Sequence, residues 1–346
     1  MRILQLIKTL NIGGVEKSTI KYSNILSSAI EFIGICSFSG HYDYSNLISK
    51  NINIFHLPRP NNRKIADIIK NLFFIINILK KYNITVIHYH HRIFLPVIYF
   101  IILFFPSVKI VYSHHCFFND FVNKFLIADK FIAISDSTKN DVLKYKRVQV
   151  EIIKHGIVML PFRLPAKERD TFNIGYIGRF TKEKRIIELI KAFQLIYRRD
   201  QRFRLILRGE GTLYNEINLS IAESGLQDFI LVDSSKDQEA DIYSGIDLLV
   251  MLSDNIEGFG LTIIEAMMFS VPVIATDIPV FKEIIINQFN GLLVNNNPED
   301  IVNAVISLFQ NDQLYLKIAK NGYQTAINDF RIETTIEKLI GLYASL

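Results

Sequence analysis

The chain has little cysteine and no tryptophan, and it lacks the features of several classes of protein. Its 346 residues include two cysteines and no Trp, and they contain no internal repeat or low-complexity tract. Two cysteines cannot form the disulfide framework of a small secreted domain, and the first residues predict a strand rather than a signal peptide. We therefore expect a globular chain that works in a reducing cytoplasm.

A hydrophobic segment long enough to span a membrane is also missing. The longest apolar run, residues 93–105, contains Pro96 and is followed by Pro106. As a helix, this run would be about 20 Å long, which is short of the roughly 30 Å hydrocarbon core of a bilayer. We interpret it as a core or interfacial helix.

Charge is distributed unevenly over a length that suits two domains. Residues 1–160 carry 20 Lys and Arg against 9 Asp and Glu, a net charge of +11, whereas residues 161–346 carry 19 against 25, a net charge of −6. A basic half can bind nucleic acid or anionic lipid, and no nucleic-acid-binding motif accompanies this one. We expect no nucleic acid partner, and we expect peripheral contact with the anionic inner face of the cell membrane.

Two glutamates eight residues apart flank a glycine-bearing turn. The apolar run 246–252 predicts a buried parallel strand, and residues 261–269 predict a helix. Glu257 then lies on the intervening loop, and Glu265 lies inside the helix. Such a loop presents backbone N–H groups to an anionic ligand, and its residues here are Gly258, Phe259 and Gly260. The alternative is a helix with one solvated and one capping glutamate.

Two cations follow the strand predicted at the start of the second domain. Arg179 and Lys184 are five residues apart in the loop that leads to the next helix. A guanidinium and an ammonium at this place can neutralise a pyrophosphate and stabilise a leaving nucleoside diphosphate. We therefore expect no metal and no cofactor. The alternative is a pair of surface cations.

Paired glycines follow the first strand of the chain. Gly13 and Gly14 lie between the strand predicted at residues 3–7 and a helix that extends to Leu26. Glycines at this place permit close approach of the backbone to a ligand. They are a weak signal by themselves, because many α/β proteins have such a turn.

Histidines cluster at the ends of two further predicted strands. His88 and His90 end the strand at residues 85–90, and His114 and His115 follow the strand that begins at Lys109. We interpret His88 and His90 as packed or hydrogen-bonded residues of a strand end. A metal pair at His114 and His115 is unsupported, since no set of Asp, Glu or Cys at ligand spacing accompanies them.

Together these segments resemble the retaining glycosyltransferases of family four (glycosyl transferases group 1), most specifically over residues 173–294. The resemblance implies an α/β chain with the GT-B fold, in which two Rossmann-like, doubly wound domains face a cleft. Residues 1–160 would bind the acceptor, 161–171 would link the domains, and 172–330 would bind the nucleotide-sugar. Residues 331–346 would form a helix that packs back toward the N-terminal domain.

The resemblance also implies roles for single residues. Glu257 would lie beside the donor sugar as a catalytic residue, and Glu265 would hydrogen-bond the ribose of the donor. His115 would contact the donor sugar, but His114 remains a rival because Cys116 stands where the family usually has glycine. The other implied donor-binding residues are Gly13, Gly14, Arg179, Lys184, Gly258, Phe259 and Gly260.

The implied activity is transfer of a sugar from a nucleotide-sugar to an acceptor hydroxyl with retention of anomeric configuration. The apolar, basic first half suggests a glycan or lipid-linked acceptor from the synthesis of a bacterial surface polysaccharide, such as lipopolysaccharide or capsule. The alternatives are a nucleotide-sugar epimerase of GT-B fold and a catalytically inactive GT-B partner subunit. Intact Glu257, Glu265, Arg179 and Lys184 argue against the inactive subunit. Arg185 replaces the glycine usual after the lysine, so the geometry of that loop can differ.

Overall fold

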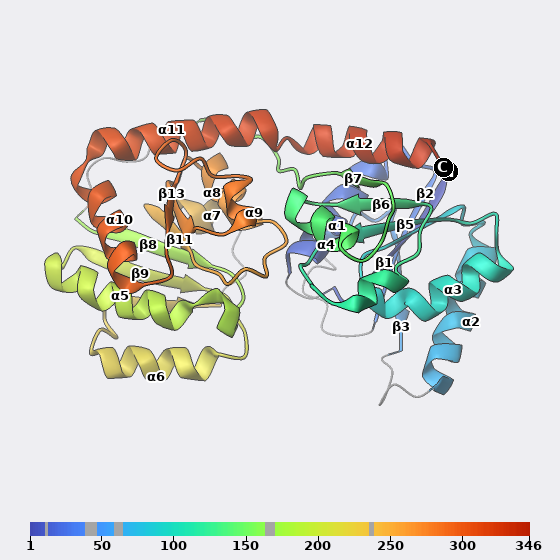
Figure 1. Cartoon of the computed structure of the whole chain (residues 1–346), viewed down its shortest axis with the longest axis horizontal. Coiled ribbons are helices and arrows are strands. Elements are labelled where there is room, and N and C mark those ends of the chain that lie inside the picture. The colour runs from blue at the N-terminus through green and yellow to red at the C-terminus, as the bar shows by residue number, and fades with distance from the viewer. Residues whose placement is uncertain (11–12, 39–46, 59–64, 163–169, 235–238) are drawn as a thin grey trace. The chain divides into compact units, whose positions relative to one another are not determined.

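Strands and helices alternate along the computed structural model, which describes residues 1–10, 13–38, 47–58, 65–162, 170–234 and 239–346 (Figure 1). They group into two units, Met1–His155 with Glu333–Leu346, and Gly156–Ile332. The first unit ends five residues before position 160, because Ile157 forms a bridge with Arg331 of the second unit. Most of the segment expected to link the domains, residues 163–169, lies outside the described residues.

The first unit is built on a parallel sheet with the strand order β3-β2-β1-β4-β5-β6-β7. Its strands are β1 (Arg2–Ile7), β2 (Phe32–Phe38), β3 (Asn53–Leu57), β4 (Val86–Tyr89), β5 (Lys109–His114), β6 (Lys130–Ala133) and β7 (Val150–Ile152). Its helices are α1 (Gly14–Leu26), α2 (Ile65–Lys81), α3 (Leu95–Phe104), α4 (Asp136–Leu143) and α12 (Ile332–Ala344), with the 3-10 helices η2 (Arg92–Phe94) and η3 (Phe121–Phe125).

The second unit is also built on a parallel sheet, in the order β10-β9-β8-β11-β12-β13. Its strands are β8 (Phe172–Ile177), β9 (Phe203–Arg208), β10 (Ile230–Asp233), β11 (Leu248–Met251), β12 (Val273–Thr276) and β13 (Leu292–Val294). Its helices are η4 (Lys182–Lys184), α5 (Ile186–Arg199), α6 (Tyr214–Ser224), α7 (Glu239–Ser244), α8 (Leu261–Met268), α9 (Pro279–Lys282), α10 (Pro298–Gln310) and α11 (Asp312–Asp329). α5 packs against α6 and α10, and α8 packs against α11.

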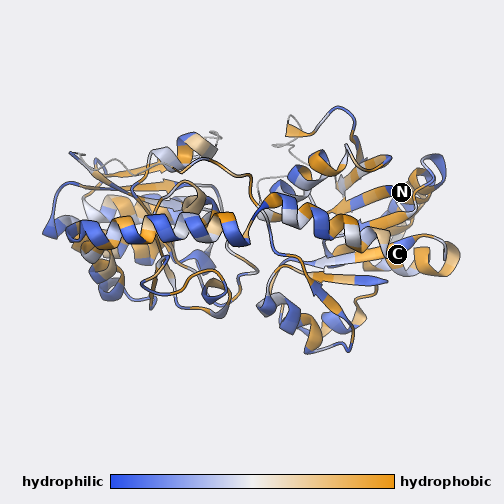
Figure 2. Cartoon of the chain, turned by 90° about the horizontal axis from the view of Figure 1, so that it is seen from above, coloured by the Kyte–Doolittle hydropathy of each residue, from blue (hydrophilic) through white to orange (hydrophobic). Residues whose placement is uncertain are grey.

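Burial explains the composition of the strands. Parallel strands that are covered by helices on both faces need apolar side chains on both faces. Ile3, Leu4, Leu6 and Ile7 of β1 are all fully buried, and β11 is fully buried apart from a slight exposure of Met251. Figure 2 shows the strands mostly in the colour of hydrophobic residues, whereas the outer helices alternate between the two colours.

Local interactions mark the limits of several elements. Ser135 is the N-cap of α4, since its side chain accepts a hydrogen bond from the backbone N–H of Thr138. α2 has Lys80 and Lys81 in its last turn, where cations interact favourably with the helix dipole. α3 has ten residues, and none of the helices in the described ranges is both long and apolar enough to cross a membrane.

The strand order reverses once in each sheet, between β1 and β4 in the first unit and between β8 and β11 in the second. Doubly wound sheets bind ligands outside the carboxyl ends of the strands at this switch point. Most of the residues singled out from the sequence lie on the segments that follow these four strands. The doubly wound α/β architecture of both units is therefore confirmed, and it directs attention to the two switch points.

Candidate functional site

An ion pair lies at the switch point of the second unit. Lys184, at the end of η4, pairs with Glu257 on the loop after β11, and the Oγ of Ser253 donates a 2.7 Å hydrogen bond to Oε1 of the same glutamate. The Lys184 side chain is 9% exposed and that of Glu257 is 16% exposed. Lys184 and Glu257, which the sequence places 73 residues apart, therefore form one nearly buried cluster.

Arg185, which follows this lysine, adopts the left-handed conformation that the usual glycine would favour. Its φ is 52°, and for a residue with a side chain this region costs about 1–2 kcal/mol. Its guanidinium donates to Oδ1 of Asp254 at 2.7 Å and to Oε1 of Glu188 at 3.0 Å. The replacement of glycine thus leaves a glycine-type backbone at this turn, and the two carboxylates hold the arginine in place.

Arg179 follows β8 and its side chain is exposed, in contrast to Lys184. Its backbone is fixed, because the Tyr176 hydroxyl donates a 2.9 Å hydrogen bond to the carbonyl oxygen of Arg179. Burial raises the pKa of Glu183, yet this pKa lies below its ordinary value, in part because of the positive charges of Arg179 and Lys184. The loop after β8 thus presents one exposed and one nearly buried cation.

The turn Gly258-Phe259-Gly260 leads from Glu257 into α8. Gly260 is the N-cap of α8, has φ 143° and provides no side-chain cap for the first N–H groups of the helix. Any other residue there would be strained, and its Cβ would lie 3.1 Å from Cδ1 of Ile263. Phe259 is buried, with its ring 5.8 Å from that of Phe330. In this structure Phe259 therefore serves as a packing anchor for the turn.

Glu265 is buried inside α8, at the helical position that the sequence predicts. The Tyr243 hydroxyl on α7 donates a 2.8 Å hydrogen bond to Oε2 of this glutamate, and the Tyr243 ring stacks on Phe269 at 5.1 Å. Glu265 therefore belongs to a separate cluster from Glu257, as the spacing of the two glutamates on loop and helix predicts.

In the first unit, the paired glycines open α1. Gly13 is its N-cap in an extended conformation, and Gly14 is its first residue. A Cβ on Gly13 would come within 2.3 Å of Oε2 of Glu16, whose other oxygen accepts a 3.1 Å hydrogen bond from the Thr9 hydroxyl. The glycine thus leaves room for the Glu16 carboxylate, and its extended backbone does not require glycine.

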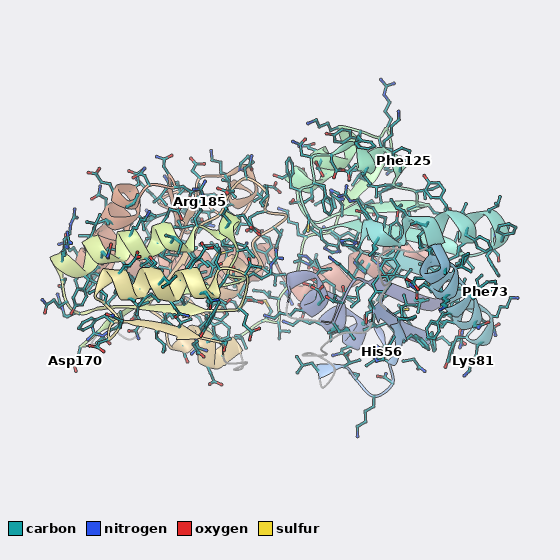
Figure 3. All side chains as sticks on the ribbon, turned by 90° about the horizontal axis from the view of Figure 1, so that it is seen from below. His56, Phe73, Lys81, Phe125, Asp170 and Arg185 are labelled. Atoms are coloured by element: carbon teal, nitrogen blue, oxygen red, sulfur yellow. The ribbon has the colours of Figure 1, made fainter. Side chains whose placement is uncertain are left out.

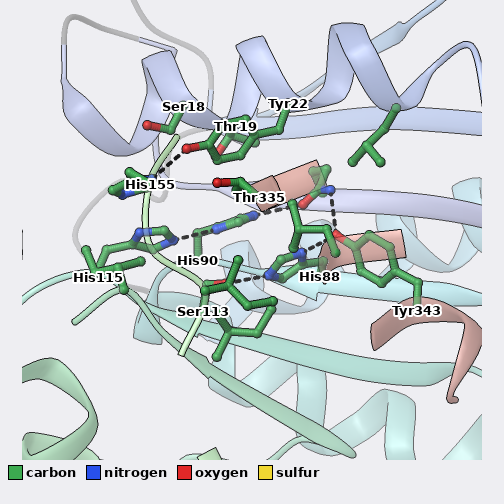
Figure 4. Close-up of a pocket in the computed structure, with 16 residues that line it drawn as sticks. Ser18, Thr19, Tyr22, His88, His90, Ser113, His115, His155, Thr335 and Tyr343 are labelled. Atoms are coloured by element: carbon green, nitrogen blue, oxygen red, sulfur yellow. Dashed lines mark hydrogen bonds between the residues drawn. The ribbon is translucent and has the colours of Figure 1, made fainter. Parts of the chain in front are cut away.

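A cavity of about 30 Å³ lies at the switch point of the first unit (Figure 4). Four histidines line it together with Gln5, Ser18, Thr19, Tyr22, Ser113, Thr335 and Tyr343. His90 Nδ1 lies 2.8 Å from His115 Nε2, and the rings of His115 and His155 stack at 5.6 Å. His155 Nδ1 is 3.0 Å from the Tyr22 hydroxyl. The expectation that His88 and His90 are hydrogen-bonded strand-end residues is confirmed.

Burial keeps these histidines neutral. It lowers the pKa of His88 to about 3, with a smaller contribution from His115, and that of His155 to about 4. The pKa values of His90 and His115 also lie well below their ordinary value, chiefly because of burial and then because of the neighbouring histidines. Each imidazole therefore carries one donor and one acceptor nitrogen at neutral pH.

The two adjacent histidines after β5 have different surroundings. His114 is fully buried, and its ring nitrogens contact Tyr112 at 2.9 Å and Asp141 of α4 at 2.8 Å. Asp141 also accepts hydrogen bonds from the backbone N–H groups of Phe118 and Asn119, so it anchors the whole loop. His115 is only partly buried, and it is the member of the pair that lines the cavity.

Comparison with known proteins agrees with these two units. The family model described as Glycosyltransferase Family 4 matches residues 12–159, and the model described as Glycosyl transferases group 1 matches residues 162–325. With two doubly wound parallel sheets, these matches define a glycosyltransferase of the GT-B class. The chain belongs to family four, glycosyl transferases group 1, and the resemblance stated from the sequence is confirmed.

Individual relatives are distant. An uncharacterised glycosyltransferase of Methanocaldococcus jannaschii is 32% identical over 198 residues, which cover 56% of this chain and 54% of the relative. The capsular polysaccharide biosynthesis glycosyltransferase CapM of Staphylococcus aureus is 26% identical over 62% of this chain and 61% of its own length. The chain thus spans a little over half the length of these two relatives.

A solved structure shows the same fold along the whole chain. The crystal structure of the Anabaena protein HepE in complex with UDP and glucose has a TM-score of 0.85 and covers all of both chains at 18% identity. At this identity the likeness concerns the fold, which supports the GT-B architecture.

Several partners of the predicted residues were not identified from the sequence. Ser253 holds Glu257, Tyr243 holds Glu265 and Asp141 holds the loop of His115. No local pattern marks these contacts, because each joins different elements of the fold. The sequence did give one indication of this kind. Arg185 stands where the family usually has glycine, which indicated that the loop after Lys184 can differ.

Proposed function

We propose that the chain is a retaining glycosyltransferase that transfers a sugar from a nucleotide-sugar to an acceptor hydroxyl. The observation that carries the proposal is the Lys184–Glu257 pair at the switch point of the second unit, with Arg179 on the same loop. A nearly buried ammonium interacts more strongly with a phosphate than an exposed one, because solvent screens it less. Retention of configuration rests on the family resemblance.

The charges of the second unit suggest how the donor is held. Lys184 is neutralised by Glu257 in the absence of ligand, and an incoming pyrophosphate offers the ammonium a second anionic partner. Negative charge develops on the leaving diphosphate during transfer, so a cation fixed beforehand stabilises the transition state. Glu257 would lie toward the sugar and the buried Glu265 toward the ribose. We propose that Arg179 and Lys184 make a metal ion unnecessary for this step.

The acceptor is proposed from chemistry and from the relatives. CapM is named for the synthesis of a capsular polysaccharide, and HepE was solved with UDP and glucose. We propose that this chain takes a nucleotide-sugar and a glycan or lipid-linked acceptor in the synthesis of a bacterial surface polysaccharide, on the cytoplasmic side of the membrane. His115, and not the fully buried His114, is our candidate for contact with the sugar.

The test is a thermal-shift screen of UDP-, GDP- and ADP-sugars, followed by slow hydrolysis assays with the donors that stabilise the protein. We expect one nucleotide to raise the melting temperature and its sugar to be released slowly with unchanged anomeric configuration. Release of an inverted sugar would contradict retention. An epimerised nucleotide-sugar would reveal an epimerase, and stabilisation by no donor would indicate an inactive partner subunit.

An exposed apolar surface of the first unit supports contact with a membrane. α2, α3 and η3 present Phe73, Leu103 and Phe121 with exposed fractions of 61%, 73% and 68%. The Tyr99 hydroxyl of α3 donates to the carbonyl oxygen of Phe125, which joins α3 to η3. The exposed lysines on these elements are Lys70, Lys80, Lys81 and Lys124, and Figure 3 marks Phe73, Lys81 and Phe125. We propose that this surface binds an anionic bilayer.

Flotation with anionic liposomes tests this surface. We expect binding that weakens at high salt, because each Lys or Arg near a charged bilayer is worth about 1 kcal/mol. Leu103→Asp should reduce flotation, whereas the matched control Leu219→Asp, on an exposed position of α6, should leave it unchanged. Equal flotation of both variants, or no salt dependence, would exclude the proposed surface.

A further inference from the structure

Six side chains around the cavity of the first unit form one continuous series of hydrogen bonds (Figure 4). We call it the histidine relay, and its members in order are His115, His90, Gln5, Tyr343, His88 and Ser113. The successive distances are 2.8, 2.8, 3.3, 2.6 and 2.7 Å. The relay begins at the histidine that lines the cavity after β5 and includes a tyrosine from α12, near residue 346.

The orientation of Gln5 fixes the protonation of the histidines on its side of the relay. Its Oε1 accepts from His90, so the proton of His90 lies on Nε2 and its Nδ1 is an acceptor. His115 must then donate to His90 through Nε2–H. The other nitrogen of His115, Nδ1, is left unprotonated, and it is buried without a hydrogen-bond partner among the described residues.

The same orientation of Gln5 also fixes the direction of the hydrogen bonds from Tyr343 through His88 to Ser113. Gln5 Nε2 donates to the Tyr343 oxygen, which leaves the tyrosine hydroxyl hydrogen to be donated to His88 Nδ1. His88 then donates through Nε2–H to Ser113. Each of the four inner members accepts from one neighbour and donates to the next, because all the histidines involved are neutral. The relay therefore has a single direction.

Rotation of the Gln5 amide by half a turn would reverse every hydrogen bond in the relay. Gln5 Nε2 would then donate to His90, His90 would donate to His115, and His115 would carry its proton on Nδ1. The two directions thus differ in what His115 offers a ligand, an acceptor in one and a donor in the other. A buried N–H without a partner is rarer and more costly than a bare acceptor, so the first direction is favoured when no ligand is bound.

We propose that Gln5, His90 and Tyr343 are positioning residues that keep Nδ1 of His115 unprotonated, ready to accept a hydrogen bond from a sugar hydroxyl. The identity of the ligand rests on the proposed function, whereas the direction of the relay rests on its own hydrogen bonds. Tyr343 is central because it supplies the oxygen toward which the Gln5 N–H group is turned. Through Tyr343, helix α12 thus controls which nitrogen of His115 carries the proton.

The test is ¹⁵N NMR of histidine-labelled full-length protein, with the His115 signals assigned by their loss in His115→Asn. In the wild type we expect one tautomer of His115, protonated on Nε2. Tyr343→Phe removes the acceptor of the Gln5 N–H group, so the amide gains by turning toward His90 and the second tautomer of His115 should appear. A wild-type His115 protonated on Nδ1, or a single unchanged tautomer in Tyr343→Phe, would overturn the proposal.

A second variant acts at the other end of the relay. Ser113→Ala removes the acceptor of His88 Nε2–H, which also favours the reversed direction, and it should shift the His115 tautomer in the same sense. The matched control is Tyr323→Phe, because the Tyr323 hydroxyl donates to the carbonyl oxygen of Leu160 in the second unit and does not touch the relay. This control should leave the His115 signals as they are in the wild type. A shift in the control equal to that in Tyr343→Phe would overturn the proposal.

Turnover gives a second readout. If the proposed donor is correct, Tyr343→Phe should lower kcat/KM for it about 3- to 10-fold, the worth of one ordinary hydrogen bond, with unchanged affinity for the free nucleoside diphosphate. The NMR result stands without any donor, so an unexpected substrate would contradict the proposed function and leave the relay intact. A changed tautomer with full turnover of a confirmed donor would show that the relay does not position His115 for the sugar.

Discussion

The two units hold their candidate site residues by opposite means. All eight histidines of the chain lie in residues 1–155, and those at the switch point of the first unit are neutral and held by hydrogen bonds, as between His90 and His115. The second unit contains no histidine between residues 156 and 332, and its switch point is held by the Lys184–Glu257 and Arg185–Asp254 ion pairs. The fold is shared, whereas the electrostatics of the two sites are not.

This difference separates two kinds of binding. A neutral network can change direction without moving a net charge, which suits the recognition of hydroxyl groups whose donors and acceptors must be matched. A preformed ion pair offers a cation that an anionic ligand can share, which suits a pyrophosphate. The two units should therefore respond differently to pH, to loss of charge and to metal removal.

Lowering the pH should separate the units most strongly. The folded-state pKa values of His88 and His155, about 3 and about 4, lie below the ordinary 6.5. Their neutral burial therefore stabilises the first unit fully above pH 6.5, and this stability is lost as the pH falls from 6.5 toward 4 for His155 and toward 3 for His88. At pH 5 each should have lost about 2 kcal/mol. Amide hydrogen exchange, corrected for the intrinsic effect of pH, measures the opening free energy of each unit.

The second unit, which has no histidine, provides the internal control for this experiment. The protection of its amides against hydrogen exchange, corrected in the same way, should change little between pH 7 and pH 5. A variant without the His88 imidazole, His88→Gln, should lose less stability than the wild type over the same range. Equal losses in both units would contradict the role assigned to the neutral histidines.

Removal of the buried cation should have the next largest effect. Lys184→Met should lower kcat about 100- to 1000-fold, the usual loss when one fixed group that stabilises transition-state charge is removed. The neighbouring Lys182→Met is the matched control, because Lys182 is exposed on the same short helix. Turnover of the donor identified in the thermal-shift screen measures both. Similar losses in the two variants would mean that the loop acts only by its general charge.

The two glutamates should differ in the quantity that they change. Glu265→Gln should raise the dissociation constant of the free nucleoside diphosphate about 10- to 100-fold, the worth of a hydrogen bond to a charged group. Glu257→Gln should leave that constant almost unchanged and lower kcat instead. Calorimetry run beside turnover measures both quantities. If Glu257→Gln weakened nucleotide binding and Glu265→Gln lowered only kcat, the roles of the two glutamates would be exchanged. The proposed orientation of the donor would then be reversed as well.

Metal removal should have the smallest effect. Since Arg179 and Lys184 carry the positive charge proposed for the diphosphate, activity should survive EDTA. Assays before and after treatment with the chelator measure this directly. Complete loss in chelator, restored by Mn²⁺, would show that the phosphate site has been misread.

The sequence predicted the parts of each unit that depend on local signals. An apolar run and the glycines after it predicted β11, the turn and α8. The resemblance selected loops that the structure places at the switch points, because the order of strands and helices determines which loops follow the central strands.

Contacts between distant segments could not be predicted in the same way. Gln5 and Tyr343 are 338 residues apart, and Lys184 and Glu257 are 73 apart, so no periodicity or spacing links them. The choice between His114 and His115 likewise needed Asp141, whose carboxylate is drawn to His114 only once α4 has packed against β5. Such partners are selected by packing, which a single sequence does not display.

The discontinuity of the first unit has a consequence for synthesis on the ribosome. Residues 1–155 emerge first, but residues 333–346 of the same unit follow only after the 177 residues of the second unit. At about 5–20 residues per second, the nascent first sheet waits roughly 10–35 s for α12. During that interval Gln5 and His88 lack Tyr343, and their face of the sheet lacks α12, so this is the stage at which a chaperone would find exposed surface to bind.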